Sequence, residues 1–126
     1  MAVKKQSISK IKAKADKLWS QLIRMDGSCE ICGTSENLNA HHIISRAKLH
    51  TRYMKENGIC LCVGHHMFNK DISAHGNSVA FVKWFVDKYG QERLDFLLKE
   101  SNSTEPFRVA EYRQALEDLE FLINNQ

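Results

Sequence analysis

The chain has 126 residues, of which 43% are hydrophobic and 26% charged, a composition typical of one soluble globular domain with a modest core. The apolar runs are too short to span a bilayer, and no secretory signal follows Met1. We therefore expect a single domain over residues 1–126, located in the cytoplasm, where thiols stay reduced.

The net charge of +3 is unevenly distributed along the chain. Residues 1–25 carry seven Lys and Arg residues, including Lys4 and Lys5, against one acid, whereas residues 91–126 carry eight acids against four bases. The basic front half favours a polyanionic partner such as DNA. The alternative is a solvated, lysine-rich helix face.

The elements expected along the chain are mostly helical. The apolar spacing predicts an amphipathic helix over residues 7–25, with Ser7 or Ser9 as its cap and Gly27 after its end. Two short strands are predicted over 40–46 and 59–62, separated by a basic loop. Further helices are predicted over 79–90, 91–100 and 106–124, the last with Pro106 in its first turn. The residues expected on the buried faces of the first and last helices are Ile8, Ile11, Ala15, Leu18, Trp19, Leu22, Ile23, Phe107, Ala110, Leu116, Leu119 and Ile123.

This order predicts an α+β, mostly helical fold in three parts. A basic N-terminal helix occupies residues 1–27, and a metal-bearing core with a two-stranded hairpin occupies residues 28–78. C-terminal helices occupy residues 79–126.

Two pairs of metal-binding side chains have the spacing of a zinc site. Cys29 and Cys32 form one pair, and Cys62 and His65 form the other, each with a two-residue gap. Such gaps let both ligands of a pair converge from one tight turn on a tetrahedral zinc ion. A redox role for the first pair is disfavoured because it lies in a polar turn after a helix. The sequence therefore predicts a structural zinc held by three cysteines and one histidine.

Cys60 is the remaining cysteine. It lies two residues before Cys62, on the same side of the predicted strand. It either packs in the core or replaces Cys62 as a zinc ligand. We favour the core, because only Cys62 has the two-residue gap to His65.

Two pairs of adjacent histidines frame the predicted strands. His41 and His42 lie on one strand, so their side chains are expected on opposite faces. His66 directly follows the predicted zinc ligand His65, so zinc would hold rigid the backbone from which His66 projects.

The complete pattern is Cys-x-x-Cys, "HHII", an asparagine shortly before "LC", and "HH" after two further residues, over about residues 29–70. It resembles the HNH endonucleases, the ββα-metal group of DNA nucleases. Residues 73–85, "SAHGNSVAFVKWF", also resemble the small phage-encoded members. In zinc-bearing members the second pair usually reads Cys-x-x-Cys-His, so His65 stands where a cysteine is usual. Zinc accepts a Cys₃His set as readily as Cys₄.

The resemblance implies a role for each matching position. His42 would be the general base, Asn57 would support the hairpin and orient the base, and His41 and His66 would bind a catalytic divalent cation. His75 is either a further ligand or a cap for the next helix. Because imidazole suits Mn²⁺, Ni²⁺, Co²⁺ and Zn²⁺ better than Mg²⁺, we expect activity with Mn²⁺ or Ni²⁺ at least equal to that with Mg²⁺.

Double-stranded DNA is the expected partner, bound mainly through its backbone. The cations expected to contact it lie in the basic loop between the strands: Arg46, Lys48, Arg52 and Lys55. The alternative for these four is that they only keep the loop soluble.

The sequence thus predicts a metal-dependent DNA endonuclease or nickase, in the host cytoplasm if the chain is phage-encoded. One alternative is a zinc-stapled nucleic-acid- or protein-binding module that does not cleave. Another, compatible with cleavage, is an accessory subunit that works with phage terminase or recombination proteins.

Overall fold

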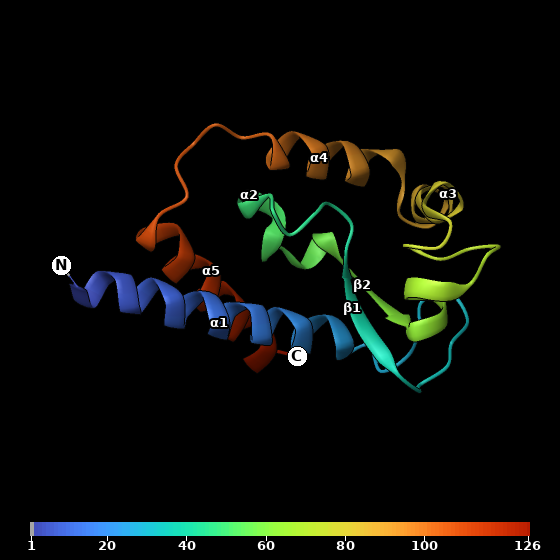
Figure 1. Cartoon of the computed structure of the whole chain (residues 1–126), viewed down its shortest axis with the longest axis horizontal. Coiled ribbons are helices and arrows are strands. Elements are labelled where there is room, and N and C mark those ends of the chain that lie inside the picture. The colour runs from blue at the N-terminus through green and yellow to red at the C-terminus, as the bar shows by residue number, and fades with distance from the viewer. Residues whose placement is uncertain (1) are drawn as a thin grey trace.

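The computed structural model describes the backbone of residues 2–126 and the side chains of residues 8–126. Helix α1 (Ala2–Arg24) is followed by a hairpin of β1 (Leu38–His42) and β2 (Gly58–Cys62), and three helices complete the chain: α3 (Ser78–Tyr89), α4 (Gln91–Ser101) and α5 (Val109–Asn124). Three short helical segments lie around the second strand: α2 (Leu49–Arg52), η1 (Lys55–Asn57) and η2 (Gly64–Phe68). The predicted α+β, mostly helical fold with one two-stranded hairpin is confirmed (Figure 1).

The N-terminal helix is longer than the sequence indicated. It starts at Ala2, so Ser9 lies inside the helix and does not cap it. The side chains of Lys4, Lys5 and Ser7 lie outside the described residues. The end of the helix is as predicted: Gly27 follows with a φ of 74° and donates its N–H to the carbonyl of Arg24.

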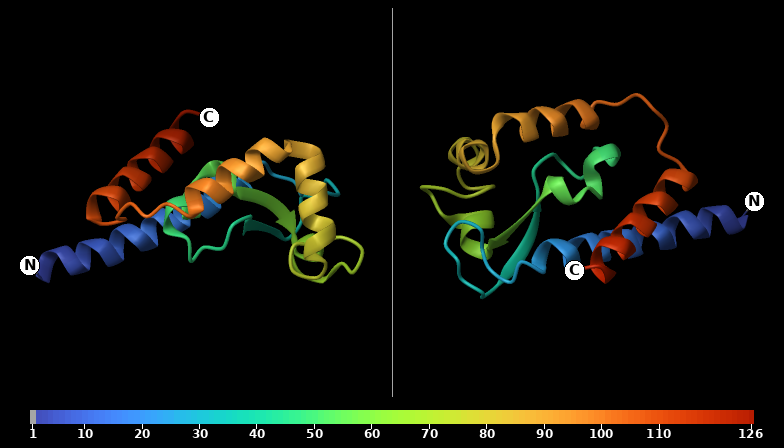
Figure 2. Two further views of the ribbon diagram at one scale, coloured as in Figure 1. Left: turned by 90° about the horizontal axis from the view of Figure 1, so that it is seen from above. Right: turned by 180° about the vertical axis from the view of Figure 1, so that it is seen from behind.

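The expected apolar face of α1 packs toward the interior. Ala15, Trp19, Leu22 and Ile23 are buried against Tyr53, Cys60, Tyr112 and Leu119. Helices α1 and α5 lie side by side on one side of the hairpin, while α3 and α4 cover the other side, as the views of Figure 2 show. The hairpin is therefore enclosed between two apolar clusters, which hold the residues at its ends in place.

The first strand is shifted relative to its prediction. It spans Leu38–His42 instead of 40–46, and pairs antiparallel with the second strand so that His42 faces Gly58. Past His42 the N–H of Ile43 still donates to the backbone carbonyl of Asn57, but the N–H and the carbonyl of Ile44 bind the Asn57 side chain in place of a strand partner. The expected strand residues after His42 therefore form a loop.

Gly58 allows α1 to approach the hairpin closely. A Cβ atom at this position would collide with the side chains of Ile23 and Trp19. Because Gly58 is the register partner of His42, this close approach brings α1 to the end of the strand that carries the histidine pair.

The last helix begins later than predicted. Pro106 lies outside it, and the helix starts at Val109 with Arg108 as its N-cap, whose N–H donates to the Glu111 carboxylate over 2.7 Å. Leu119 is buried as expected, but Ala110 is exposed, and the buried residue on this part of the helix is Tyr112. Among the helices of the described chain, none combines the length and apolar character of a membrane span.

Candidate metal centres and the histidine pocket

Four side chains converge where the turn after α1 meets the end of β2 and η2. Cys29 and Cys32 come from the turn after α1, Cys62 from the end of β2 and His65 from η2, and their ligand atoms all lie within 4.8 Å of one another. The Sγ atoms of Cys32 and Cys62 are 3.8 Å apart, and Nδ1 of His65 lies 3.8 Å from Cys29 Sγ and 3.3 Å from Cys62 Sγ. Two sulfurs bound to one tetrahedral zinc at about 2.3 Å lie roughly 3.8 Å apart. The predicted Cys₃His set therefore forms a cluster that could hold a zinc ion.

The turn that carries Cys29 favours the thiolate form of its side chain. The turn is closed by hydrogen bonds of 2.8 Å from Cys29 N–H to Thr34 and from Gly33 N–H to Cys29, with Gly33 at a φ of 81°. Burial raises the pKa of the Cys29 thiol, but hydrogen bonds from neighbouring backbone N–H groups outweigh it and lower the pKa to about 6. The thiolate, which is the form that binds zinc, is thus accessible near neutral pH.

Cys60 lies apart from this cluster. It is fully buried in the core between α1, α5 and the hairpin, and burial raises the pKa of its thiol to about 11. The structure therefore places Cys60 as a packing residue, the interpretation that the spacing favoured.

Three imidazoles form a second cluster about the hairpin. His41 comes from β1, His66 from η2 and His75 from the loop before α3, and their ligand atoms also lie within 4.8 Å of one another. Ring centroids are 5.1 Å apart for His41 with either partner and 4.8 Å apart for His66 with His75. Such a cluster could hold a divalent metal ion.

The environment of the cluster keeps the imidazoles of His41 and His66 neutral. Burial, followed by repulsion from His66, His75 and His42, lowers the pKa of His41 to about 3. Burial and the neighbouring His75 also lower the pKa of His66. Neutral imidazole is the form that binds a metal.

His75 is placed beside His66 and does not cap the next helix. The side chain of Asn77 is the cap of α3, since it accepts the N–H of Ala80 over 3.2 Å. The loop before it is held by Ser73, a fully buried residue whose hydroxyl donates to the carbonyl of Asn69 over 2.7 Å and accepts the N–H of Gly76 over 2.8 Å. Sequence reasoning missed Ser73, because a lone serine in a polar loop carries no signal.

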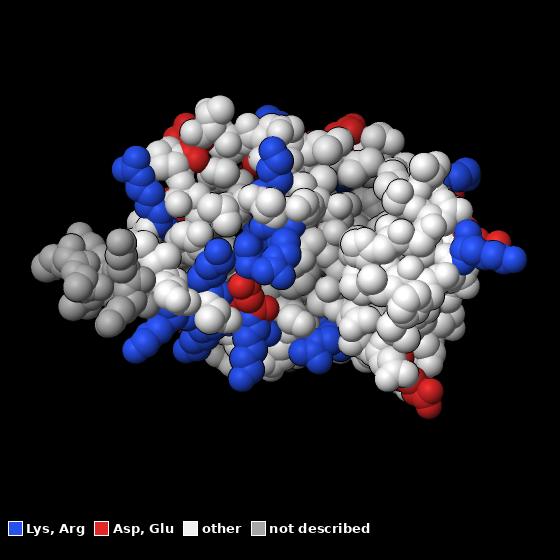
Figure 3. Space-filling model, in the orientation of Figure 1, with Lys and Arg blue, Asp and Glu red and all other residues white. Residues whose placement is uncertain are grey.

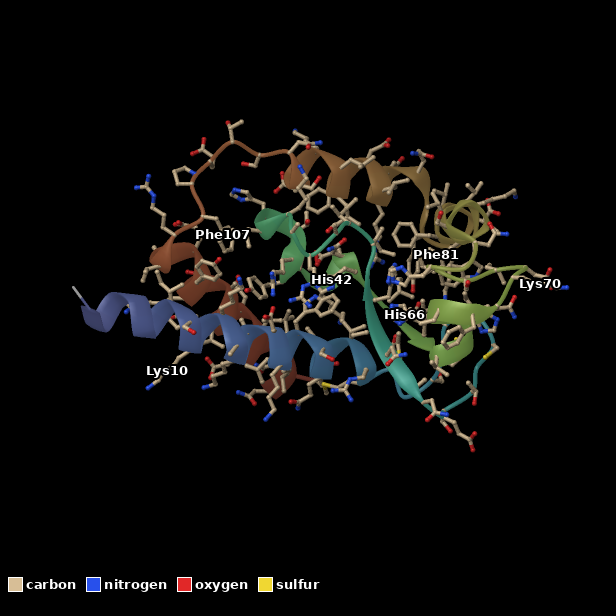
Figure 4. All side chains as sticks on the ribbon, in the orientation of Figure 1. Lys10, His42, His66, Lys70, Phe81 and Phe107 are labelled. Carbon is tan, nitrogen blue, oxygen red and sulfur yellow. The ribbon has the colours of Figure 1, made fainter. Side chains whose placement is uncertain are left out.

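His42 points to the opposite side of β1 from His41, as strand alternation predicts. Its ring lies flat on the indole of Trp19, with centroids 3.8 Å apart and planes 10° apart, whereas the ring of His41 is perpendicular to that of Phe81. Figure 4 shows His42 on one side of β1 and His66 and Phe81 on the other. Nε2 of His42 lies 3.0 Å from the carbonyl oxygen of Arg52. A carbonyl can only accept, so Nε2 carries the proton and Nδ1 keeps the free lone pair.

The lining of one pocket includes both the three histidines of the cluster and His42. The pocket has a volume of about 540 Å³, and its lining includes His41, His42, His66, His75 and Arg46. Burial is the largest influence on His42 and lowers the pKa of its ring, although its hydrogen bond to Arg52 opposes the shift. The imidazole is therefore neutral at pH 7 and able to accept a proton.

Asn57 supports this arrangement through the hydrogen bonds of its side chain. It is fully buried; its Oδ1 accepts the N–H of Ile44 over 2.8 Å, and its Nδ2 donates to the carbonyls of Ile44 and Thr51 over 3.1 Å. These bonds tie the loop after β1 to Thr51 in α2. The last residue of α2 is Arg52, whose backbone carbonyl accepts from His42. Asn57 thus lies where it can support the hairpin and hold the environment of His42.

The four cations expected to contact DNA lie in different environments. Arg46, Lys48 and Lys55 are exposed, but only Arg46 lines the histidine pocket, and Lys55 lines a separate hollow against α5. Arg52 is 5% exposed, and its guanidinium donates to both carboxylate oxygens of Asp16 over 2.9 and 2.8 Å. The prediction that Arg52 binds DNA does not fit this position, because its charge is paired inside the protein.

Comparisons with models of protein families, with curated proteins and with solved structures give no match for this chain. Function is therefore argued from the geometry of the site.

Proposed function

We propose that this chain is a metal-dependent DNA endonuclease or nickase of the HNH type. The observation that supports it best is a single pocket whose lining residues include the three histidines of the cluster and His42, the neighbour of His41 on the same strand. The order of elements, two strands followed by a helical turn that carries His66, is compatible with the ββα-metal core of this group.

In this proposal His42 is the general base. It is neutral because burial lowers its pKa, and its Nε2–H is engaged by the Arg52 carbonyl, so that Nδ1 is the nitrogen that would take a proton from water. A positioned base of this kind typically contributes about 10²- to 10⁴-fold to a rate.

His41, His66 and His75 would hold the divalent cation. When bound, the cation supplies positive charge that stabilises the phosphate and the leaving oxygen. An all-imidazole set favours Mn²⁺, Ni²⁺, Co²⁺ or Zn²⁺ over Mg²⁺, which prefers oxygen ligands. The Cys₃His cluster would hold a separate zinc with a structural role.

The charge distribution supports a DNA substrate. In Figure 3, Lys and Arg side chains gather over α1 and the segment beside it, on one part of the molecular face. On α1 the exposed cations include Lys10, Lys14, Lys17 and Arg24, which share one side of the helix. Arg46 lines the histidine pocket, and its backbone carbonyl accepts from Arg52, which binds Asp16 of α1. A phosphate backbone would thus be attracted toward the pocket without its sequence being read.

A plasmid-nicking assay with Mg²⁺, Mn²⁺, Ni²⁺ and Zn²⁺ tests the proposal. The purified protein should convert supercoiled plasmid to nicked or linear forms, and His42→Ala should abolish cleavage while retaining zinc and DNA binding. His50→Ala is the matched control, since His50 is an imidazole outside the pocket, bonded to the Glu105 carbonyl, and should leave cleavage unchanged. No cleavage with any ion, by a protein that retains zinc and binds DNA, would contradict the proposal and favour a binding module.

A further inference from the structure

We propose that helix α1 is part of the catalytic apparatus, with Trp19 as the positioning residue that holds the ring of His42. The inference rests on the proposed nuclease function. It assigns to the N-terminal helix a role at the reacting centre in addition to its basic surface.

The indole of Trp19 covers one face of the His42 imidazole and restrains the plane of that ring. The two rings are 3.8 Å apart and nearly parallel, at 10°. Trp19 is itself fixed, because it is 3% exposed and its Nε1–H donates to the carbonyl of Met54 over 2.9 Å. The bond to Met54 satisfies the buried indole N–H and fixes the plane of the indole, and the parallel stack then gives the imidazole a defined orientation.

The edge of the His42 ring is restrained by the same helix, through Arg52. Nε2 of His42 donates to the Arg52 carbonyl, and the Arg52 guanidinium is held by both carboxylate oxygens of Asp16. Asp16 and Trp19 are three residues apart on α1 and therefore lie on one side of the helix. One helix face thus controls both the plane and the hydrogen bond of the proposed base.

The backbone of the hairpin is adapted to this contact. Gly58, the strand partner of His42, has no Cβ, and a Cβ there would collide with Trp19 and Ile23. The close approach of α1 therefore depends on a glycine at position 58 of the strand.

Two substitutions separate positioning from packing. Trp19→Leu keeps an apolar side chain but removes the flat surface, whereas Trp19→Phe keeps an aromatic face and loses only the bond to Met54. In plasmid cleavage, kcat should fall roughly 10- to 100-fold in Trp19→Leu, as expected for a misplaced catalytic group, with little change in KM. Trp19→Phe should retain most of the wild-type kcat. Asp16→Asn should lower kcat by less than Trp19→Leu does.

Leu119→Ala is the matched control for lost packing. Leu119 is 1% exposed in the same core cluster but lies on α5, so this variant should lose stability without losing kcat. All variants are compared at a temperature where circular dichroism shows them folded.

A second measurement does not depend on cleavage. In proton NMR spectra of the full chain, ring protons of His42, assigned by their disappearance in His42→Ala, should be shifted upfield by the stacked indole. Trp19→Leu should move them back downfield. Wild-type kcat in Trp19→Leu, or His42 ring signals that the substitution leaves in place, would overturn the inference. Absence of cleavage by the wild-type protein would instead contradict the proposed function, and with it the catalytic role of Trp19.

Discussion

The backbone N–H of His75 donates to the carbonyl oxygen of His66 over 2.9 Å, and the N–H of Ala74 donates to His65 over the same distance. These two bonds tie the loop before α3 to η2, the π-helical turn that carries one residue of each candidate metal cluster, His65 and His66. Single-turn π-helices are frequent at functional sites. The Cys₃His cluster and the histidine cluster are therefore joined by one short segment of backbone.

Replacing a zinc ligand should remove the metal, whereas replacing the neighbouring core cysteine should not. We expect Cys32→Ser to lower zinc content well below one ion per chain, because a tetrahedral site needs all four ligands. Cys60→Ala, which changes a fully buried thiol outside the cluster, should retain one zinc. Elemental analysis after dialysis against a chelator measures both. Loss of zinc in Cys60→Ala alone would mean that the ligand assignment is wrong.

His75 should contribute to metal binding despite its position in a loop. Its imidazole is one of three in the cluster, so His75→Ala should weaken binding of Mn²⁺ or Ni²⁺ to the zinc-loaded protein by at least about tenfold. Isothermal titration calorimetry measures the affinity. His50→Ala serves as the control, because His50 packs against Phe107 away from the pocket. Equal affinities of His75→Ala and wild type would exclude His75 as a ligand.

Tyr53 should make folding sensitive to alkaline pH. Its Oη is buried and has no hydrogen-bond partner among the described residues, and burial, with the nearby Asp16 charge, raises its pKa to about 12 from the usual 10. The stabilisation from the neutral phenol is fully present below pH 10 and is lost as the pH rises toward and through 12. Urea denaturation should show a decline in the free energy of unfolding over this range.

Tyr53→Phe should weaken that alkaline decline. At pH 7 the variant should be more stable than wild type by about 1 kcal/mol, because a buried hydroxyl without a partner is removed. A decline between pH 10 and 12 that is identical in both proteins would show that Tyr53 does not titrate there.

The surface cations and the buried arginine should behave differently toward DNA. Arg46→Ala and Lys48→Ala should each reduce the slope of log affinity against log salt concentration by about 1, because each removes a phosphate contact. Arg52→Ala should leave this slope unchanged but lower the free energy of unfolding by on the order of 2 kcal/mol. This cost is below that for a fully buried pair because Asp16 is partly exposed. Fluorescence anisotropy with a labelled duplex at several salt concentrations distinguishes the two cases.

The sequence alone predicted the main helices, the hairpin, the four residues of the Cys₃His cluster and two residues of the histidine cluster, His41 and His66. Helical spacing identified the buried face of α1, and the two-residue gaps selected Cys29, Cys32, Cys62 and His65 over Cys60. These features are local, since they depend on residues within a turn or a few turns of one another. Element ends were less well predicted, because β1 ends where the side chain of Asn57, thirteen residues along the chain, binds Ile44.

Only the tertiary structure decided how distant residues share the site. The sequence predicts Arg52 as a surface cation, whereas the structure pairs it with Asp16, 36 residues earlier. The sequence predicts Trp19 only as a core residue, whereas the structure stacks it on His42. Likewise, His75 joins the histidine cluster because its loop folds back onto η2. Periodicity indicates which face of an element is buried, but the partner that covers that face is set by packing between elements far apart in the chain.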